Sequence, residues 1–186
     1  MGPYIALGVI LAIIVIPMLW FISAQRRLVA MDENINNALS AIGVQLSSRF
    51  DALTALLDLT KGYAKHESET LLNTVKARRT VITASSSPKE VEEQENVITE
   101  ALGRINAVAE QYPQLKADET YLKTMDSVNS YEKSVRASRL VYNDSVTKLN
   151  RAIRMFPTSV AASMLHIEKR DYLAENTEKA EMPSMK

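Results

Sequence analysis

The sequence predicts an all-α protein in which an N-terminal transmembrane helix leads into an antiparallel up-down four-helix bundle with long first and last helices. Three observations predict this class. An apolar stretch without any charge runs from Ile5 to Ile22. Apolar residues then recur at steps of three and four through most of the chain. The chain has only 5 Gly and 6 Pro and no Cys, which is typical of a helical domain without disulfides.

The apolar stretch is expected to be an uncleaved membrane anchor over residues 1–24, with residues 4–23 in contact with lipid. A secretory signal would carry basic residues before the stretch and a small residue upstream of its cleavage site. Cleavage after Ala24 is formally open, but it would place Ile22 at that small position. A buried helix of a soluble core rarely runs so long without a polar residue.

Basic residues predict the orientation of this single-pass anchor. Arg26 and Arg27 follow the apolar stretch directly, and no Lys or Arg precedes it. By the positive-inside rule, the N-terminus is expected outside and the rest of the chain in the cytoplasm.

Residues 25–157 are expected to form the bundle, and its first helix continues from the anchor without a break. Gly62 is the first plausible stop, since Gly costs about 1 kcal/mol relative to Ala inside a helix. A turn there and one continuous helix are both open. The second helix is expected from about His66 to Thr83. The apolar positions of these two helices are Leu28, Met31, Ile35, Ala38, Leu39, Ile42, Leu46, Phe50, Leu53, Leu56, Leu57 and Tyr63, then Leu71, Leu72, Val75 and Ile82.

A capping box predicts the start of the third helix. Ser87 stands at the N-cap, Pro88 at the first helical position and Glu90 three residues after the cap. The helix is expected to end before Pro113, because the residue before a proline is disfavoured in the helical conformation. Its predicted buried stripe consists of Val91, Ile98, Ala101, Leu102, Ile105, Val108, Ala109 and Tyr112.

Asp118 is expected to cap the last helix, and Pro157 to close it. The first and last helices would each span on the order of 55 Å, about twice the length of the middle pair. Near the membrane the two long helices would cover only each other, as a coiled coil or a site of self-association. The stripe of the last helix contains Tyr121, Leu122, Met125, Val128, Val135, Tyr142, Val146, Leu149, Ile153 and Phe156.

The chain beyond the bundle divides into two segments. Residues 158–173 form a short amphipathic segment in which apolar residues lie near Lys169 and Arg170, and we expect it to rest at the membrane interface. The alternative is a short helix folded back against the bundle. Residues 174–186 are charged and are expected to be a disordered tail.

Composition and motifs argue against the common catalytic and binding chemistries. The chain holds 22 Lys and Arg and 22 Asp and Glu, so no excess of basic charge points to nucleic acid. His66 and His166 are the only histidines, which excludes the usual zinc ligand sets. HExxH, phosphate-loop and GxSxG motifs are absent from the sequence. No catalytic, cofactor-binding or metal-ligating residue is therefore predicted, and Glu92, Glu93 and Glu95 are expected on a solvated helix face.

Several stretches resemble the bacterial LemA family in sequence and order. They are QLSSRFD at 45–51, KGYAKHE at 61–67, AVAEQYPQLKA at 107–117 and RLVYNDSV at 139–146, followed by Asn150, Ile153, Phe156-Pro157 and EKRDY at 168–172. The resemblance implies a membrane-anchored helical bundle in a bacterial inner or plasma membrane, of undefined role and without established catalytic residues. The chain departs from the family pattern at Leu39 and Gly43, where relatives often have Trp and Asp, at Thr54-Ala55 in place of Pro-Asn, and at Leu149 in place of Tyr.

Two functions are open on these grounds. The first is a non-enzymatic scaffold or adaptor that self-associates or binds unknown protein partners at the bilayer surface. Arg49 and Asp51 cannot share one helix face, so each is expected to have a partner on another helix. The alternative is an enzyme or small-molecule sensor at the bundle tip. The candidate structural or docking residues are Arg49, Asp51, Lys61, Tyr63, His66, Glu67, Tyr112, Tyr142 and Asn143, of which Tyr63, His66 and Glu67 would form the tip site.

Overall fold

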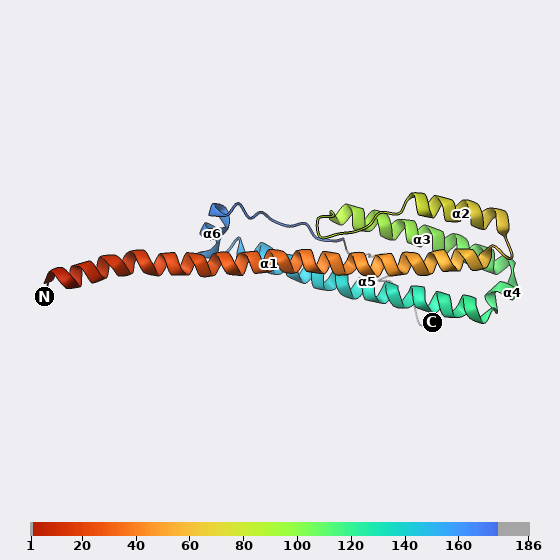
Figure 1. Ribbon diagram of the computed structural model, residues 1–186, viewed down its shortest axis with the longest axis horizontal. Helices are drawn as coiled ribbons and strands as arrows, with labels where there is room; N and C mark the ends of the chain where they lie inside the picture. The colour runs from red at the N-terminus through yellow and green to blue at the C-terminus, as the bar shows by residue number, and fades with distance from the viewer. Residues whose placement is uncertain (1, 175–186) are drawn as a thin grey trace, which may run out of the picture. The chain divides into compact units, whose positions relative to one another are not determined.

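The computed structural model describes residues 2–174, except for the side chains of Gly2, Pro3, Ile5, Ala6 and Glu67. Over this range the chain is helical and contains no β-strand, which confirms the all-α class. The predicted tail lies outside the described residues apart from Ala174. The helices, labelled in Figure 1, are α1 (Gly2–Thr60), α2 (Lys65–Ala77), α3 (Pro88–Gln111), α4 (Pro113–Lys116), α5 (Glu119–Ala152) and α6 (Thr158–Met164).

The described chain divides into two compact units. Unit 1 comprises residues 2–36 and 144–171, and unit 2 comprises residues 37–143 and 172–174. Helices α1 and α5 therefore each contribute one part to each unit. Among the described residues, α1 is the one helix that is long and apolar enough to cross a membrane. Pro17 lies inside α1 without ending it, as is common where apolar helices span lipid.

The apolar stripes predicted from sequence supply the core of unit 2. Each large side chain that is fully buried contributes about 1.5–3 kcal/mol relative to an exposed one. Two predicted positions are exposed, Leu122 at 49% and Tyr63 at 36%. Four more are only half-buried: Leu102, Val108, Tyr112 and Met125. The buried members are Ala38, Leu39, Ile42, Leu46, Phe50, Leu53, Leu56 and Leu57 of α1, Leu71, Leu72 and Val75 of α2, Val91, Ile98, Ala101, Ile105 and Ala109 of α3, and Tyr121, Val128, Val135 and Tyr142 of α5.

The break at Gly62 is a turn between two helices, as one of the two readings predicted. Helix α1 ends at Thr60, and the backbone N–H groups of Tyr63 and Ala64 both donate to the Thr60 carbonyl at 3.0 Å. The buried hydroxyls of Thr60 and Ser68 lie 2.8 Å apart and hydrogen bond across the turn. This bond satisfies two buried polar groups where α1 passes into α2.

The predicted end of the second helix at Thr83 is wrong, because α2 stops at Ala77. Beyond it the Thr80 N–H donates to Oε1 of Gln94 in α3 at 2.6 Å, and the Ile82 side chain is buried. The Ile82 carbonyl approaches α1 so closely at Gly43 that a Cβ there would overlap it. Residues 80–83 are all β-branched and therefore favour a helix only weakly. They contact α1 and α3 and do not extend α2 by another turn.

Helix α3 begins as its sequence predicts. The Glu90 N–H donates to Ser87 Oγ at 3.3 Å, and the Ser87 N–H donates to a Glu90 carboxylate oxygen at 2.6 Å. The helix ends at Gln111, ahead of Pro113. The short helix α4 then fills a connection for which the sequence predicted no helix, and it buries Leu115. The Asp118 carboxylate accepts from the Tyr121 N–H at 2.9 Å and caps α5.

In unit 1 the end of α5 differs from the prediction. The helix stops at Ala152, and Phe156, expected on the buried stripe, is 83% exposed. The Arg154 N–H donates to the Arg151 carbonyl at 3.1 Å, so the chain leaves the α-helix through a tighter turn ahead of Pro157. Helix α6 follows and buries Ala161 and Ala162. The interfacial placement expected for residues 158–173 stays a prediction.

Candidate functional site

A buried arginine in unit 2 connects α1 with α5. Arg49 is 4% exposed, and its Nη2 donates to Oε2 of Glu132 at 3.0 Å. The other oxygen of Glu132 accepts from Arg136 at 2.8 Å, so one carboxylate serves two guanidinium groups. Arg49 Nε is buried and makes no hydrogen bond. Because a desolvated guanidinium is costly without its counter-ion, this pair fixes the two helices to each other.

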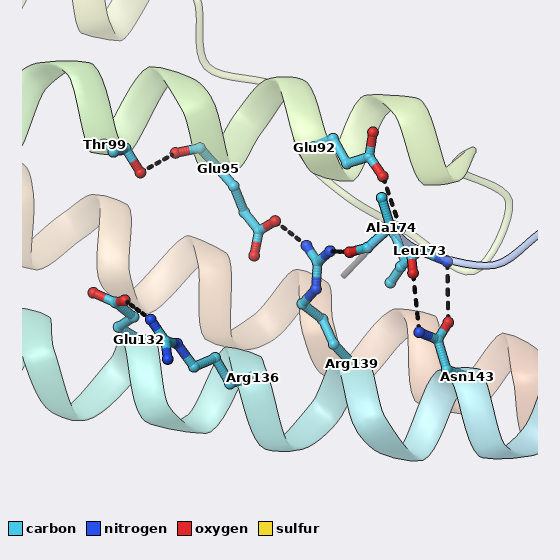
Figure 2. Close-up of polar contacts among 9 residues, drawn as sticks. All are labelled: Glu92, Glu95, Thr99, Glu132, Arg136, Arg139, Asn143, Leu173 and Ala174. Carbon is cyan, nitrogen blue, oxygen red and sulfur yellow. Dashed lines mark hydrogen bonds and ion pairs between the residues drawn. The ribbon is translucent and has the colours of Figure 1, made fainter. Parts of the chain in front are cut away.

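A second buried ion pair connects α3 with α5. Arg139 and Glu95 are each 9% exposed, and Nη1 of Arg139 donates to the Glu95 carboxylate. Burial raises the pKa of Glu95 above its usual value, and the opposing attraction of Arg139 is the smaller effect. Nη2 of Arg139 donates to the carbonyl of Ala174, so the same guanidinium also holds residues 170–174, here called the C-terminal segment (Figure 2).

The amide of Asn143 holds Leu173 by both of its polar atoms. Its Nδ2 donates to the Leu173 carbonyl at 3.0 Å, and its Oδ1 accepts from the Leu173 N–H at 3.0 Å. The next N–H, that of Ala174, donates to Oε1 of Glu92 at 3.0 Å. The Leu173 side chain is only 1% exposed. As Figure 2 shows, polar side chains of α3 and α5 here pair with an extended main chain as a neighbouring strand would.

Unit 1 contains a second asparagine whose amide pairs with both main-chain groups of a distant residue. Asn150 Nδ2 donates to the Arg170 carbonyl at 2.9 Å, and Asn150 Oδ1 accepts from the Arg170 N–H at 3.0 Å. The Arg170 guanidinium donates to both oxygens of Asp32, at 2.9 and 3.0 Å. The two asparagines are seven residues apart on α5 and their partners three residues apart in extended chain.

The expectation that Arg49 and Asp51 have separate partners is correct, with one difference. Arg49 pairs with Glu132 on another helix, whereas Asp51 pairs at 3.2 Å with Arg79, which lies in the connection beyond α2. The Arg79 guanidinium also lies 4.6 Å above the Phe50 ring. These contacts attach the connection to α1 through charge and aromatic surface together.

The structure describes the side chains of two of the three predicted tip residues, Tyr63 and His66. Tyr63 and Tyr112 form a tilted ring pair with centroids 6.1 Å apart. Lys61 pairs with Asp58 at 2.7 Å, and His66 is exposed. The Glu67 side chain lies outside the described part of the structure. Among the described residues, no group of three His, Asp or Glu side chains is placed to hold a metal ion.

Sequence reasoning missed the charged side chains that organise unit 2. Glu95, expected on a solvated face, is buried beside Ile98, and Arg139 is buried between Val135 and Tyr142 along the stripe of α5. Arg139 stands four residues after Val135 and three before Tyr142. An ionic residue at an apolar stripe position was therefore a readable signal for a buried pair. Asn150 and Arg170 are among the residues that resemble the LemA family, but the sequence did not indicate their pairing, because an amide that pairs with distant main chain leaves no periodicity.

Unit 2 also carries an apolar groove of about 200 Å³ between α1 and α5. Its floor is made of small side chains, and Val141 beside it is 57% exposed. Two further exposed apolar side chains are close to the lining residues in sequence: Leu140, directly before Val141, is 73% exposed, and Val44, three residues after Ala41, is 62% exposed. The lining residues are Ala38, Ala41, Ala137, Ser138 and Val141.

Comparison with known proteins gives a consistent result. The sequence model of the LemA family matches residues 38–186. Protein LemA of Metamycoplasma hominis is 30% identical over 150 residues, which cover 79% of this chain and 67% of that protein. Magnetosome protein MamQ of Magnetospirillum gryphiswaldense is 32% identical over 75 residues, which cover 40% of this chain and 28% of that protein. Magnetosome protein MamQ 1 of Paramagnetospirillum magneticum matches over the same shares.

Proposed function

The chain belongs to the LemA family, and we propose that it is a membrane-anchored, non-enzymatic helical scaffold. Residues 4–23 would hold it as a single-pass protein in a bacterial inner or plasma membrane, with the N-terminus outside. Residues 25–157 would form an antiparallel up-down four-helix bundle on the cytoplasmic side. This bundle would self-associate or bind protein partners at the bilayer surface, with its long helices as a coiled coil near the membrane.

The apolar groove of unit 2 carries this proposal. Small side chains let another helix approach closely, and exposed Val44 and Leu140 add apolar area to the surface around it. An amphipathic helix laid in such a groove gains affinity by burying its apolar face.

The predicted polar residues support the same reading, because they hold the bundle in shape. Arg49 pairs with Glu132, Asp51 with Arg79, and Asn143 with the main chain of Leu173. Each of these contacts joins elements distant in sequence. Such cross-links keep the helix faces beside the groove in a fixed arrangement, which is what a docking surface requires.

A charge placed in the groove tests the proposal. Ala137→Arg should abolish co-capture of a second tagged copy, or of crosslinked partners, from native membranes. The matched control is Ala107→Arg, because Ala107 is likewise an exposed helical alanine but lies on α3, outside the groove lining. Equal capture by both variants, with unchanged helix content, would contradict a role for the groove.

A further inference from the structure

We propose that Glu92, Arg139 and Asn143 form a receptor site for an extended peptide, and that this site accepts the C-terminal segment of a second copy in exchange for its own. The receptor site lies wholly in unit 2, on α3 and α5. The inference rests on the proposed self-association and names the contact through which two copies would be joined.

The polar groups of the receptor site bind main-chain atoms of the segment and none of its side chains. Leu173 presents its N–H and carbonyl to Asn143, while Ala174 presents its N–H to Glu92 and its carbonyl to Arg139. All four peptide-side atoms belong to the backbone. Any extended peptide can offer them, as in recognition by strand addition. Selectivity must then come from the Leu173 side chain, which is almost completely buried.

The segment can leave without unfolding a helix. The described backbone bonds of Arg170, Leu173 and Ala174 go to side chains, so none belongs to a helix ladder. After departure, Arg139 keeps its buried bond to Glu95. The bonds that Asn143 and Glu92 make to Leu173 and Ala174, and the space of the Leu173 side chain, can then be taken up by another segment. An empty site is unfavourable because it exposes apolar surface and unpaired polar groups.

A second copy is the occupant that these contacts favour. Its segment has the same leucine and the same extended main chain, so every hydrogen bond lost in one molecule is regained in the pair. The net cost is therefore entropic. Anchoring of both copies in one bilayer raises their effective concentration at each other's receptor sites and lowers that cost.

Complementation between two full-length variants tests the exchange. Asn143→Asp keeps the segment but removes the amide donor of the receptor site, while Leu173→Ala keeps the receptor site but removes the anchoring side chain. The variants carry different tags and are reconstituted together in phosphatidylcholine and phosphatidylglycerol vesicles. We expect at least about tenfold more co-capture in the mixture than in either variant paired with itself. Equal capture in all three samples would overturn the exchange.

A control and a second measurement keep this test decisive. Asn129→Asp changes an exposed asparagine on the same helix but leaves both segment and receptor site intact, so it should pair with itself as the unchanged chain does, which neither test variant should. A labelled peptide of residues 168–174 should bind the full-length Leu173→Ala chain, whereas the same peptide with alanine in place of its leucine should not. If neither peptide bound, the receptor site would be refuted. This outcome does not depend on whether the Asn143→Asp variant folds.

The outcomes also separate this inference from the proposed function. Strong pairing of every variant with itself, abolished by Ala137→Arg, would refute the exchange and support self-association through the groove. Absence of pairing in every mixture, together with absence of any protein captured from native membranes, would refute both proposals.

Discussion

Two parts of the molecule are held in place by opposite means. The helices of unit 2 are joined by rows of buried apolar side chains such as Ile42, Leu53 and Ile98, each of which contributes through contact area. The C-terminal segment around Leu173 is held by a few hydrogen bonds to its main chain and by one buried leucine. Distributed burial resists local opening, whereas a few point contacts allow a segment to detach on its own.

The two kinds of contact also differ in how well they can be predicted from the sequence. Apolar rows repeat with the helix period and are legible in the sequence. The pairing of Asn143 and Asn150 with distant main chain depends on where the chain returns, and no local pattern encodes it. We order the following predictions by their expected effect on the free energy of unfolding, from the largest to the smallest.

Ile98→Ala should cause the largest loss, because Ile98 is fully buried in the apolar row of α3. We expect the free energy of unfolding to fall by about 3 kcal/mol, as lost burial and a residual cavity add. Urea unfolding in detergent, followed by circular dichroism, measures this change. Val81→Ala, at a side chain that is 66% exposed, should change stability by less than about 0.5 kcal/mol. Equal losses would contradict distributed apolar packing.

Gly43→Ala should destabilise the contact between α1 and the connection after α2. The added methyl group would overlap the backbone carbonyl of Ile82, which can be relieved only by a shift of that segment. We expect a loss of about 2 kcal/mol in thermal or urea unfolding. Gly103→Ala is the control, since a Cβ there meets open space and a helical Gly is itself unfavourable. A stabilised Gly43→Ala protein would show that Ile82 does not lie against α1.

Ser87→Ala should remove the side-chain half of the capping box at the start of α3. The Glu90 N–H would lose its acceptor, and we expect a loss of about 1 kcal/mol in urea unfolding. Ser130→Ala, at an exposed position inside α5, is the matched control and should leave stability equal or slightly higher. Unchanged stability of Ser87→Ala would mean that water replaces the cap without cost.

Asn143→Ala should act locally on the C-terminal segment. Loss of both bonds to Leu173 should speed amide hydrogen exchange at Leu173 and Ala174 by at least about tenfold. The free energy of global unfolding should fall by less than about 1 kcal/mol, because the helices keep their apolar contacts. Asn129→Ala on the same helix should leave both measurements unchanged. A decrease in the free energy of global unfolding as large as that of Ile98→Ala would contradict the view that the C-terminal segment opens independently of the helices.

Glu95→Gln should change the pH dependence of stability more than its magnitude. Burial raises the folded-state pKa of Glu95 above its usual value of 4.5. Its contribution to stability is therefore fully present below that value and is lost as pH rises through the raised pKa. Urea unfolding between about pH 4 and about pH 7 should show this decrease in the free energy of unfolding for the unchanged chain and not for Glu95→Gln.

Glu90 provides a control of opposite sign on the same helix. Hydrogen bonds from the backbone and side chain of Ser87 lower the pKa of Glu90 below its usual value of 4.5. Its contribution is present above that value and is lost as pH falls through the lowered pKa. Glu90→Gln should therefore flatten the acid side of the stability profile. The same pH profile for both variants would contradict the burial assigned to Glu95.

Local chemistry explains which parts of the fold and site could be predicted. The capping box at Ser87, the cap at Asp118 and the turn after Thr60 depend on neighbours in sequence. The early ends of α2 and α5, the exposure of Phe156 and the burial of Glu95 do not. They depend on which surfaces meet, and so on residues far away in the chain.

The long helices, most of their apolar rows, the apolar N-terminal helix and the family follow from the sequence alone, because each is encoded in short-range periodicity or in ordered motifs. The short helix α4 and the ends of α2 and α5 do not. The burial of Arg139 between Glu95 and the carbonyl of Ala174, and the pairing of Asn143 with Leu173, became known only from the folded chain. The physical reason is that a polar side chain has many partners of similar free energy in the unfolded chain. Packing selects one of them by removing the others from reach and by excluding water.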